Sequence, residues 1–322
     1  MKGGSRLVPW LTMEASIGTT TTPEATPATT RVDEDSAGDA ARTDAGALPN
    51  LIVIGAQKCG TSGLHYYLSL HPEISVSRPK ELNFFIAERN WPKGVDWYRS
   101  HFDPEARVRS EASPNYTAYP QHLDVPERMQ SVVPEAKLLY MVRDPIDRIA
   151  AHWVHNYAKR REKGDLRTTL LHPNTSYLAR SHYYAQLQRF LRLYPFERVM
   201  VIEQEELRNR RLETLQRIFE FVGVDPGFSH PGFATQRHRT ARKRRGTPLT
   251  RILEGIDRRR GSVSARRLRA LGGRILPLGR SIEVPDVRGA LPPETLRSLR
   301  DDAERLRDLT GLDLSGWSIW DV

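Results

Sequence analysis

The chain has 322 residues, a formal net charge of +10 and a single cysteine, Cys59. This length is enough for one large α/β domain or two smaller ones, with a substantial hydrophobic core in either case. A lone cysteine excludes an internal disulfide and a cysteine-based metal cluster, and it fits a reducing compartment.

The basic excess suits a phosphate-bearing ligand, an acidic glycan, nucleic acid or an anionic surface. Much of it lies in three arginine-rich stretches, at 157–164, 237–246 and 251–274. Aromatic residues are not interleaved with these stretches, so solvated helix faces are the simpler interpretation and no nucleic-acid partner is expected. No apolar run reaches the roughly 18 residues that span a bilayer, so we predict a cytoplasmic protein without a transmembrane segment.

The chain divides into a polar tail and a domain with alternating elements. Residues 1–48 are rich in Thr, Ala, Pro and Asp, which predicts a disordered tail before a single domain at 49–322. Strand candidates lie at 50–57, 73–77, 107–113, 137–142 and 198–207. Helix candidates lie at 61–72, 145–162, 181–195 and 292–311. This alternation predicts an α/β fold with a central parallel sheet flanked by helices.

The loop after the first predicted strand resembles a P-loop, which indicates a P-loop-containing nucleotide-binding fold. Gly55 and Gly60 have the P-loop spacing, but Thr61 occupies the usual lysine position and Lys58 lies inside the loop. Backbone amides and the following helix N-terminus can still hold an anion, with hydroxyl donors from Thr61 and Ser62. The altered order argues against a magnesium-dependent ATPase or GTPase. A strand-to-helix turn with a solvent-exposed lysine is the alternative.

The stretch "KCGTSGL" resembles the 5′-phosphosulfate loop of sulfotransferases that use 3′-phosphoadenylyl sulfate (PAPS). The resemblance implies that Lys58, Cys59, Gly60, Thr61 and Ser62 bind PAPS. It also implies that Lys58 helps neutralise the departing 3′,5′-adenosine bisphosphate (PAP). No metal is expected, because fixed cations and amides can stabilise the charge that develops on the leaving oxygen.

A second motif, "VRDPIDRIAAHW", follows a predicted strand and resembles the family segment R-x-P-x-x-R-x-x-S. Asp144 and Pro145 suit the start of a helix. In the family, the first Arg and the Ser bind the 3′-phosphate, which implies that role for Arg143 and for position 151. Arg148 matches the second Arg, but Ala151 replaces the Ser, so we expect the loss of a contact worth about 0.5–1.5 kcal/mol. Helix-start arginines paired with acidic neighbours are the alternative.

The stretch "RPKELNFF" resembles a segment of the carbohydrate sulfotransferases, especially those acting on heparan sulfate. The resemblance implies that Glu81 is the general base and that Lys80, with Lys58, steadies the sulfate. Desolvation by Phe84 and Phe85 would raise the pKa of Glu81, whereas a nearby lysine would lower it. A surface carboxylate paired with Lys80 is the alternative.

Two further sets of residues are candidates for the acceptor side. His65 and His152 are alternative bases because an imidazole titrates near neutrality, although each lies in a helical pattern that favours simple packing. The stretch "EASPNYTAYP" resembles a family element lining the acceptor cleft. It implies that Ser113, Asn115 and Tyr116 bind the acceptor, and a plain turn is the alternative.

The resemblance extends over about residues 51–318, which makes 49–322 a single sulfotransferase domain. Within it, 240–248 corresponds to a basic loop that closes over the cofactor, with Arg244 as a candidate contact. An ordinary exposed basic loop is the alternative. The disulfide near this loop in Golgi heparan sulfate enzymes cannot form here, because the chain has one cysteine.

Together these motifs predict metal-independent, in-line sulfuryl transfer from PAPS to a hydroxyl or amine. The expected acceptor is a carbohydrate, a glycolipid or a glycosylated metabolite. One alternative is a P-loop nucleotide kinase, which is disfavoured because Arg143 stands where a magnesium carboxylate is expected. The other is a non-catalytic protein that binds nucleotides or anionic polymers.

Overall fold

A five-stranded parallel sheet forms the centre of the computed structural model, which describes residues 46–162, 164–170, 175–235 and 282–321. Its spatial order is β2-β3-β1-β4-β5. The strands are β1 (Leu51–Gly55), β2 (Ile74–Val76), β3 (Val108–Ala112), β4 (Lys137–Val142) and β5 (Val199–Glu203). Every residue of β1 is buried, as expected for a central parallel strand covered on both faces. The predicted α/β fold is confirmed.

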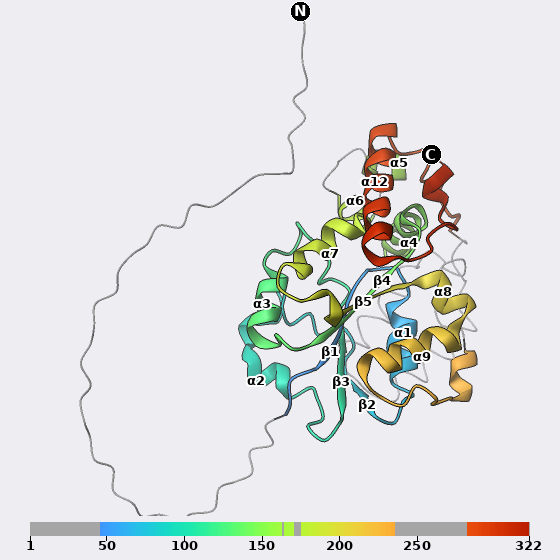
Figure 1. The fold of residues 1–322 in the computed structure, drawn as a ribbon. Helices are drawn as coiled ribbons and strands as arrows, with labels where there is room; N and C mark the ends of the chain where they lie inside the picture. Colours follow the sequence, from blue (N-terminus) through green and yellow to red (C-terminus); the bar gives the residue numbers. More distant parts are fainter. Residues whose placement is uncertain (1–45, 163, 171–174, 236–281, 322) are drawn as a thin grey trace, which may run out of the picture. The chain divides into compact units, whose positions relative to one another are not determined.

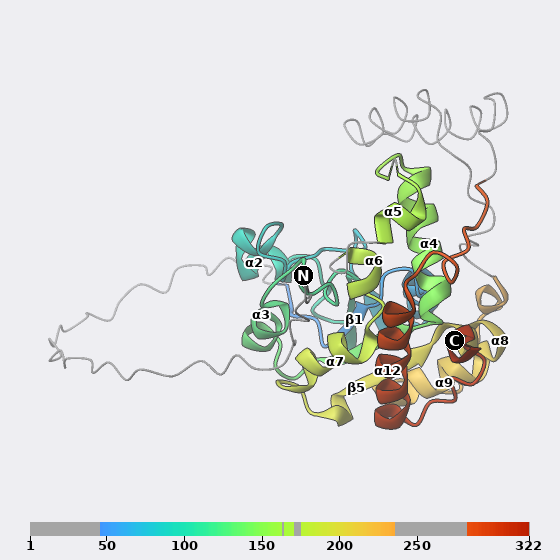
Figure 2. The same ribbon diagram turned by 90° about the horizontal axis from the view of Figure 1, so that it is seen from above.

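Helices cover both faces of this sheet. The α-helices in the described part of the chain are α1 (Thr61–Leu68), α2 (Gly94–Arg99), α3 (Val125–Val132), α4 (Pro145–Ala158), α5 (Leu166–Leu170), α6 (Ser176–Ala179), α7 (Tyr183–Leu191), α8 (Gln204–Asn209), α9 (Arg211–Val222) and α12 (Pro293–Thr310). Figures 1 and 2 show α2 and α3 on one side of the strands and α8 and α9 on the other. The connections between parallel strands therefore pass over the sheet faces, as crossover units require.

Local sequence signals explain where several helices begin and end. The Asp144 carboxylate accepts the amide hydrogens of Ile146 and Asp147, so α4 begins at the predicted cap. At the other end of the chain, α12 ends at Gly311 in a left-handed conformation with φ of 67°. All four predicted helices form, although each is shorter than its predicted range.

One predicted strand is partly wrong. The strand expected at 198–207 ends at Glu203, and the chain turns directly into α8. Glu205 and Glu206 lie in the first turn of that helix, where carboxylates interact favourably with the positive end of the helix dipole. Acidic residues after the apolar run therefore mark a helix start.

The C-terminal helix α12 is fixed against α7 by a shared polar contact. Asp302 of α12 accepts hydrogen bonds from the amides of Tyr184 at 2.9 Å and Ala185 at 3.0 Å. These amides belong to the first turn of α7, where His182 gives no side-chain cap. A residue over one hundred positions away in sequence thus completes the cap of α7.

The strand order determines where a ligand site is expected. Strand β1 lies between β3 and β4, so the connections after β1 and β4 diverge from a common point. Parallel strands place all their carboxyl ends at one edge of the sheet, and ligands of such folds bind in the crevice at this switch point. The loops after β1, β2, β3 and β4 all begin at this edge.

Candidate active site

The loop after β1 is fixed against the two neighbouring strands. The Ala56 amide donates to the carbonyl oxygen of Met141 in β4 at 2.7 Å. A Cβ atom on Gly55 would lie 1.9 Å from Oγ1 of Thr117, so only glycine fits this position. A hydrogen bond to β4 and close packing against the segment after β3 therefore hold the start of the loop where the ligand crevice is expected.

The same loop ends in an uncapped helix N-terminus. Gly60 has φ of 91° and precedes α1, whose first turn receives no side-chain cap from the residues that the structure describes. The amide groups of Thr61 and Ser62 belong to that first turn and have no intrahelical acceptor. Lys58 has φ of 77° and adds a cation within the loop. These features form a fitting cradle for a phosphate or sulfate group.

Arg143 follows β4 directly and adds a second cation at the same edge. Its guanidinium lies 2.6 Å from the Asp147 carboxylate and 3.9 Å from that of Glu205. Its Nε atom is buried without a hydrogen-bond partner among the described residues. Burial alone lowers the pKa of Arg143, but nearby negative groups, Asp147 foremost, raise it above its ordinary value. Arg143 is therefore a permanently charged group with an unused donor.

Arg148 supports the loop from within the protein. Its side chain is completely buried, and it donates to Oγ of Ser181 at 2.6 Å and to the carbonyl oxygen of Tyr177 at 2.5 Å. A third, longer contact of 3.4 Å reaches the carbonyl oxygen of Gln57 in the loop. Ala151, also buried, lies further along α4 and has no polar group to offer a phosphate.

Glu81, the predicted base, lies at the surface in the segment after β2. Its side chain is 43% exposed, and its carboxylate lies 2.9 Å from Nζ of Lys80. Phe84 and Phe85 are fully buried, and Phe84 stacks on Tyr98 with ring centroids 4.2 Å apart. These two aromatic side chains therefore belong to the core, and the carboxylate is paired with Lys80. The role of Glu81 as a base stays a prediction.

Two predicted acceptor residues have their hydroxyl groups directed into a buried network. Glu111 is fully buried and accepts hydrogen bonds from Ser113 at 2.5 Å and Tyr116 at 2.8 Å. The same hydroxyl oxygens accept the amide hydrogens of Asn83 and Phe84, each at 2.9 Å. The network thus positions the chain just after the predicted base. Direct contact of Ser113 and Tyr116 with an acceptor stays a prediction.

The two candidate histidines differ in their surroundings. His152 is buried, packs against Tyr177 and has a pKa well below its ordinary value, because burial and then Arg148 disfavour its charged form. The pKa of His65 is lowered to about 4, chiefly by burial and then by Lys80, while Glu81 opposes the lowering. His65 is therefore neutral near pH 7, and its role as the alternative base stays a prediction.

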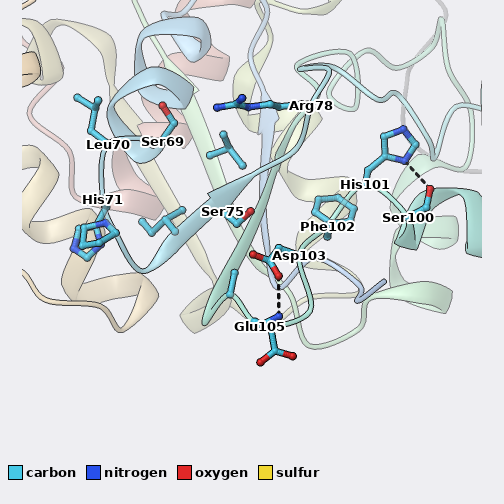
Figure 3. Close-up of a pocket in the computed structure, with 14 residues that line it drawn as sticks. Ser69, Leu70, His71, Ser75, Arg78, Ser100, His101, Phe102, Asp103 and Glu105 are labelled. Carbon is cyan, nitrogen blue, oxygen red and sulfur yellow. Dashed lines mark hydrogen bonds between the residues drawn. The ribbon is translucent and has the colours of Figure 1, made fainter. Parts of the chain in front are cut away.

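A separate hollow of about 870 Å³ lies along the edge strand β2. Figure 3 shows Ser75 and Arg78 on one side of it and His101, Phe102 and Asp103 on another. None of the residues lining it belongs to the loop after β1 or to α4. This hollow is therefore distinct from the candidate site.

Some expectations concern residues beyond the described ranges. Residues 1–45 of the predicted tail, the basic loop at 240–248 and Arg244 lie outside them. The domain boundaries stay a prediction for the same reason. Within the described ranges, no three His, Cys, Asp or Glu side chains group as a metal site. In that same part of the chain, no helix is long and apolar enough to cross a membrane.

Comparisons of the sequence with known proteins identify a family and several relatives. Residues 48–259 match the family model of the sulfotransferase domain. The chain is 31% identical over 205 residues to the bifunctional heparan sulfate N-deacetylase/N-sulfotransferase 2 of Homo sapiens, covering 56% of this chain and 22% of the relative. It is 30% identical over 195 residues to the heparan sulfate glucosamine 3-O-sulfotransferase 5 of Mus musculus, covering 56% of this chain and 55% of the relative. The match thus spans about a fifth to about half of these relatives.

A solved structure is similar over nearly its whole length. The crystal structure of a sulfotransferase from Alicyclobacillus acidocaldarius aligns with a TM-score of 0.60 and 26% sequence identity. The alignment covers 84% of this chain and 99% of that chain. The similarity therefore extends beyond the loop after β1 and the five strands of the sheet.

Proposed function

This chain belongs to the sulfotransferase domain family, and on that premise we propose that it transfers a sulfuryl group from PAPS to a hydroxyl or amine of a carbohydrate, glycolipid or glycosylated metabolite. One observation carries the proposal: Lys58, the uncapped N-terminus of α1 and Arg143 all lie at the carboxyl ends of the adjacent strands β1 and β4. Cations and open amides at one edge suit a ligand with separate anionic groups. The relatives named for heparan sulfate support a carbohydrate acceptor.

Each residue of the donor side has a distinct task in this proposal. PAPS supplies the activated sulfuryl group. The first-turn amides of α1 and the hydroxyls of Thr61 and Ser62 bind its phosphosulfate end, while Arg143 binds the 3′-phosphate. Lys58 stabilises the negative charge that develops on the leaving bisphosphate. Fixed donors of this kind can stabilise that charge without a metal ion.

Glu81 performs the proton transfer in this proposal. Its carboxylate accepts the proton of the acceptor hydroxyl or amine as the acceptor attacks sulfur and the bond to the phosphate oxygen breaks. The Glu111 network holds the segment that follows Glu81, which supports a fixed position for the backbone next to the carboxylate. Lys80 orients the carboxylate through their 2.9 Å contact. General base catalysis of this kind contributes about 10²–10⁴-fold to the rate.

Calorimetric titration with PAP in the absence of magnesium tests the donor site. We expect wild type to bind, and Lys58→Ala and Arg143→Ala to weaken binding about tenfold or more, because each removes a charge-assisted contact. Lys159→Ala is a matched control, since Lys159 is exposed at the end of α4. Magnesium-dependent binding of ATP without binding of PAP would instead favour a nucleotide kinase.

Glu81→Gln separates an enzyme from a binding protein. We expect this variant to bind PAP as wild type does and to release PAP from PAPS about 100-fold more slowly with an acceptor glycan. His65→Asn is the companion variant, and it should retain turnover. If His65→Asn abolishes turnover and Glu81→Gln does not, the base is His65. A wild-type protein that binds PAP but transfers no sulfuryl group to any tested hydroxyl or amine would be a binding protein.

A further inference from the structure

Arg180 is a buried cation whose bonding capacity is not used. It lies directly after α6, and only 7% of its surface is exposed. Nη1 donates to Oδ1 of Asn115 at 2.8 Å, but Nε is buried with no hydrogen-bond partner in the described part of the chain. No described carboxylate lies within 4.0 Å of its guanidinium. A buried charge without a counter-ion is costly, so an anion bound beside Arg180 would stabilise it.

Two asparagines connect this cation to the predicted base. Asn115, which follows β3, donates to Oδ1 of Asn83 at 2.9 Å. Asn83 in turn donates to the carbonyl oxygen of Glu81 at 2.7 Å. Arg180 is therefore on the side of the site formed by the loops after β2 and β3, where the acceptor is expected.

The residue after Arg180 connects it to the donor side. Ser181 accepts the hydrogen bond from Nε of Arg148, the arginine that reaches the carbonyl oxygen of Gln57 in the loop after β1. Arg180 thus lies between the support of the donor loop and the segment of the base. An anion held there would lie on the side of the site that carries the predicted base.

Neighbouring charges do not compensate Arg180. The pKa of Arg180 is lowered to about 9, chiefly by burial and then by the cations Arg148 and Arg89, while Glu81 opposes the lowering. Arg180 therefore remains protonated near neutral pH. Glu81 is already paired with Lys80. The local balance of charge is positive and favours a bound anion.

We propose that Arg180 and Asn115 form a subsite for a carboxylate or sulfate ester of the acceptor, adjacent to the hydroxyl or amine that is sulfated. The inference rests on the proposed sulfuryl transfer and specifies an anionic acceptor. A guanidinium offers paired N–H groups that match the two oxygens of such an anion. The donor is a less suitable occupant, because its binding residues follow β1 and β4 whereas Arg180 bonds to the loop after β3.

Binding by the PAP-saturated protein tests this subsite with three probes. The first is an oligosaccharide that contains uronic acid, the second is the same oligosaccharide with its carboxylates reduced to alcohols, and the third is the reduced form bearing sulfate esters. We expect wild type to bind the first, the third or both at least about tenfold more tightly than the neutral form. The two charged probes distinguish a carboxylate from a sulfate ester.

Variants of Arg180 separate its charge from its hydrogen bond. Arg180→Gln retains a donor for Asn115 without the charge, so we expect it to lose the preference for the charged probes. Arg180→Lys keeps the charge and should retain most of the preference. Arg192→Gln removes an exposed charge at the end of α7 and should behave as wild type. Thermal melting confirms that each variant is folded.

Three outcomes would overturn the proposal. One is a wild-type protein with no preference for either charged probe, and another is an Arg180→Gln variant that keeps the preference. The third is an Arg180→Gln variant that binds PAPS or PAP more weakly than wild type, which would assign Arg180 to the donor-binding site. Failure of wild type to bind PAP at all would be a failure of the proposed function, and the PAP titration reveals it before any probe is added.

Discussion

Arg148 lies 3.4 Å from the carbonyl oxygen of Gln57, and this contact joins the interior of the protein to the donor loop. The arginine is fully buried, and its other donors bond to Ser181 and Tyr177 near the end of α6. One side chain of α4 therefore ties the loop after β1 to the segment that contains Arg180. The second Arg of the family motif therefore contacts the loop after β1 from within the protein.

Replacement of Arg148 should therefore affect stability and donor binding together. Arg148→Met removes a donor from Oγ of Ser181 and from the carbonyl oxygen of Gln57, while the carbonyl oxygen of Tyr177 keeps the Ser181 hydroxyl as a donor. We expect the free energy of unfolding to fall by about 1–3 kcal/mol. PAP binding should also weaken, because the loop loses its support. Urea denaturation and calorimetry measure the two effects. A variant with unchanged stability would show that these contacts contribute little.

Restoring the family serine at position 151 should strengthen donor binding. Ala151 is buried on α4, the helix that begins just after Arg143. A hydroxyl there adds one hydrogen bond to the 3′-phosphate, so we expect Ala151→Ser to tighten PAP binding by about 0.5–1.5 kcal/mol, or about 2- to 10-fold. Ala150→Ser is the control, because position 150 is also buried but lies on another face of α4. Equal effects of both substitutions would argue against a phosphate contact at 151.

Features encoded in contiguous residues were predictable from the sequence. The spacing of Gly55 and Gly60 indicates the loop, and Asp144 followed by Pro145 marks the start of α4. Each signal acts through the residue's own backbone or its nearest neighbours. The parallel sheet follows from the alternation of these local elements, so the fold class is confirmed even though strand and helix ends differ by several residues.

Features that depend on distant contacts were not predictable in the same way. The motif that contains Ser113 and Tyr116 was recognisable in the sequence. The sequence did not show that their hydroxyl groups turn toward the buried carboxylate of Glu111. Arg180 belongs to no motif, and its unused Nε becomes apparent only when Asn115 is brought beside it. Hydrogen bonds between residues about 65 positions apart leave no periodic pattern in sequence.

The buried network gives a pH-dependent effect on stability. Ser113→Ala removes a donor to Glu111 and the acceptor for the Asn83 amide, so we expect a loss of about 1–3 kcal/mol. Burial raises the pKa of Glu111, and the Ser113 hydrogen bond lowers it. Without that bond the ionised carboxylate becomes less favourable, so the loss should grow as pH rises.

Denaturation of Ser113→Ala at pH 5 and pH 8 measures this dependence. Ser110→Ala is a matched control, because Ser110 is equally buried but its hydroxyl has no partner among the described residues. That substitution should cost little or even stabilise the protein. A similar loss for both variants would mean that burial of the side chain, rather than the bond to Glu111, determines the effect.

Glu203 at the end of β5 should reduce stability above neutral pH. Burial raises the pKa of Glu203 to about 7, although its carboxylate accepts a hydrogen bond from Nε1 of Trp317 at 2.6 Å. In the unfolded chain a glutamate titrates near pH 4.3, so its ionisation costs stability progressively between about pH 4.3 and 7. The neutral form is favoured below this range, and the cost is complete above pH 7.

Glu203→Gln should remove this pH dependence. Its amide oxygen can still accept from Trp317, and we expect a gain of about 1 kcal/mol at pH 8, less than the full shift implies because the carboxylate is only partly buried. At pH 4 the variant should match wild type. Glu197→Gln, at an exposed position before β5, is the control and should change stability at neither pH. If Glu203→Gln destabilises the protein at pH 8, the ionised carboxylate must be favoured in the folded state, with Trp317 stabilising it.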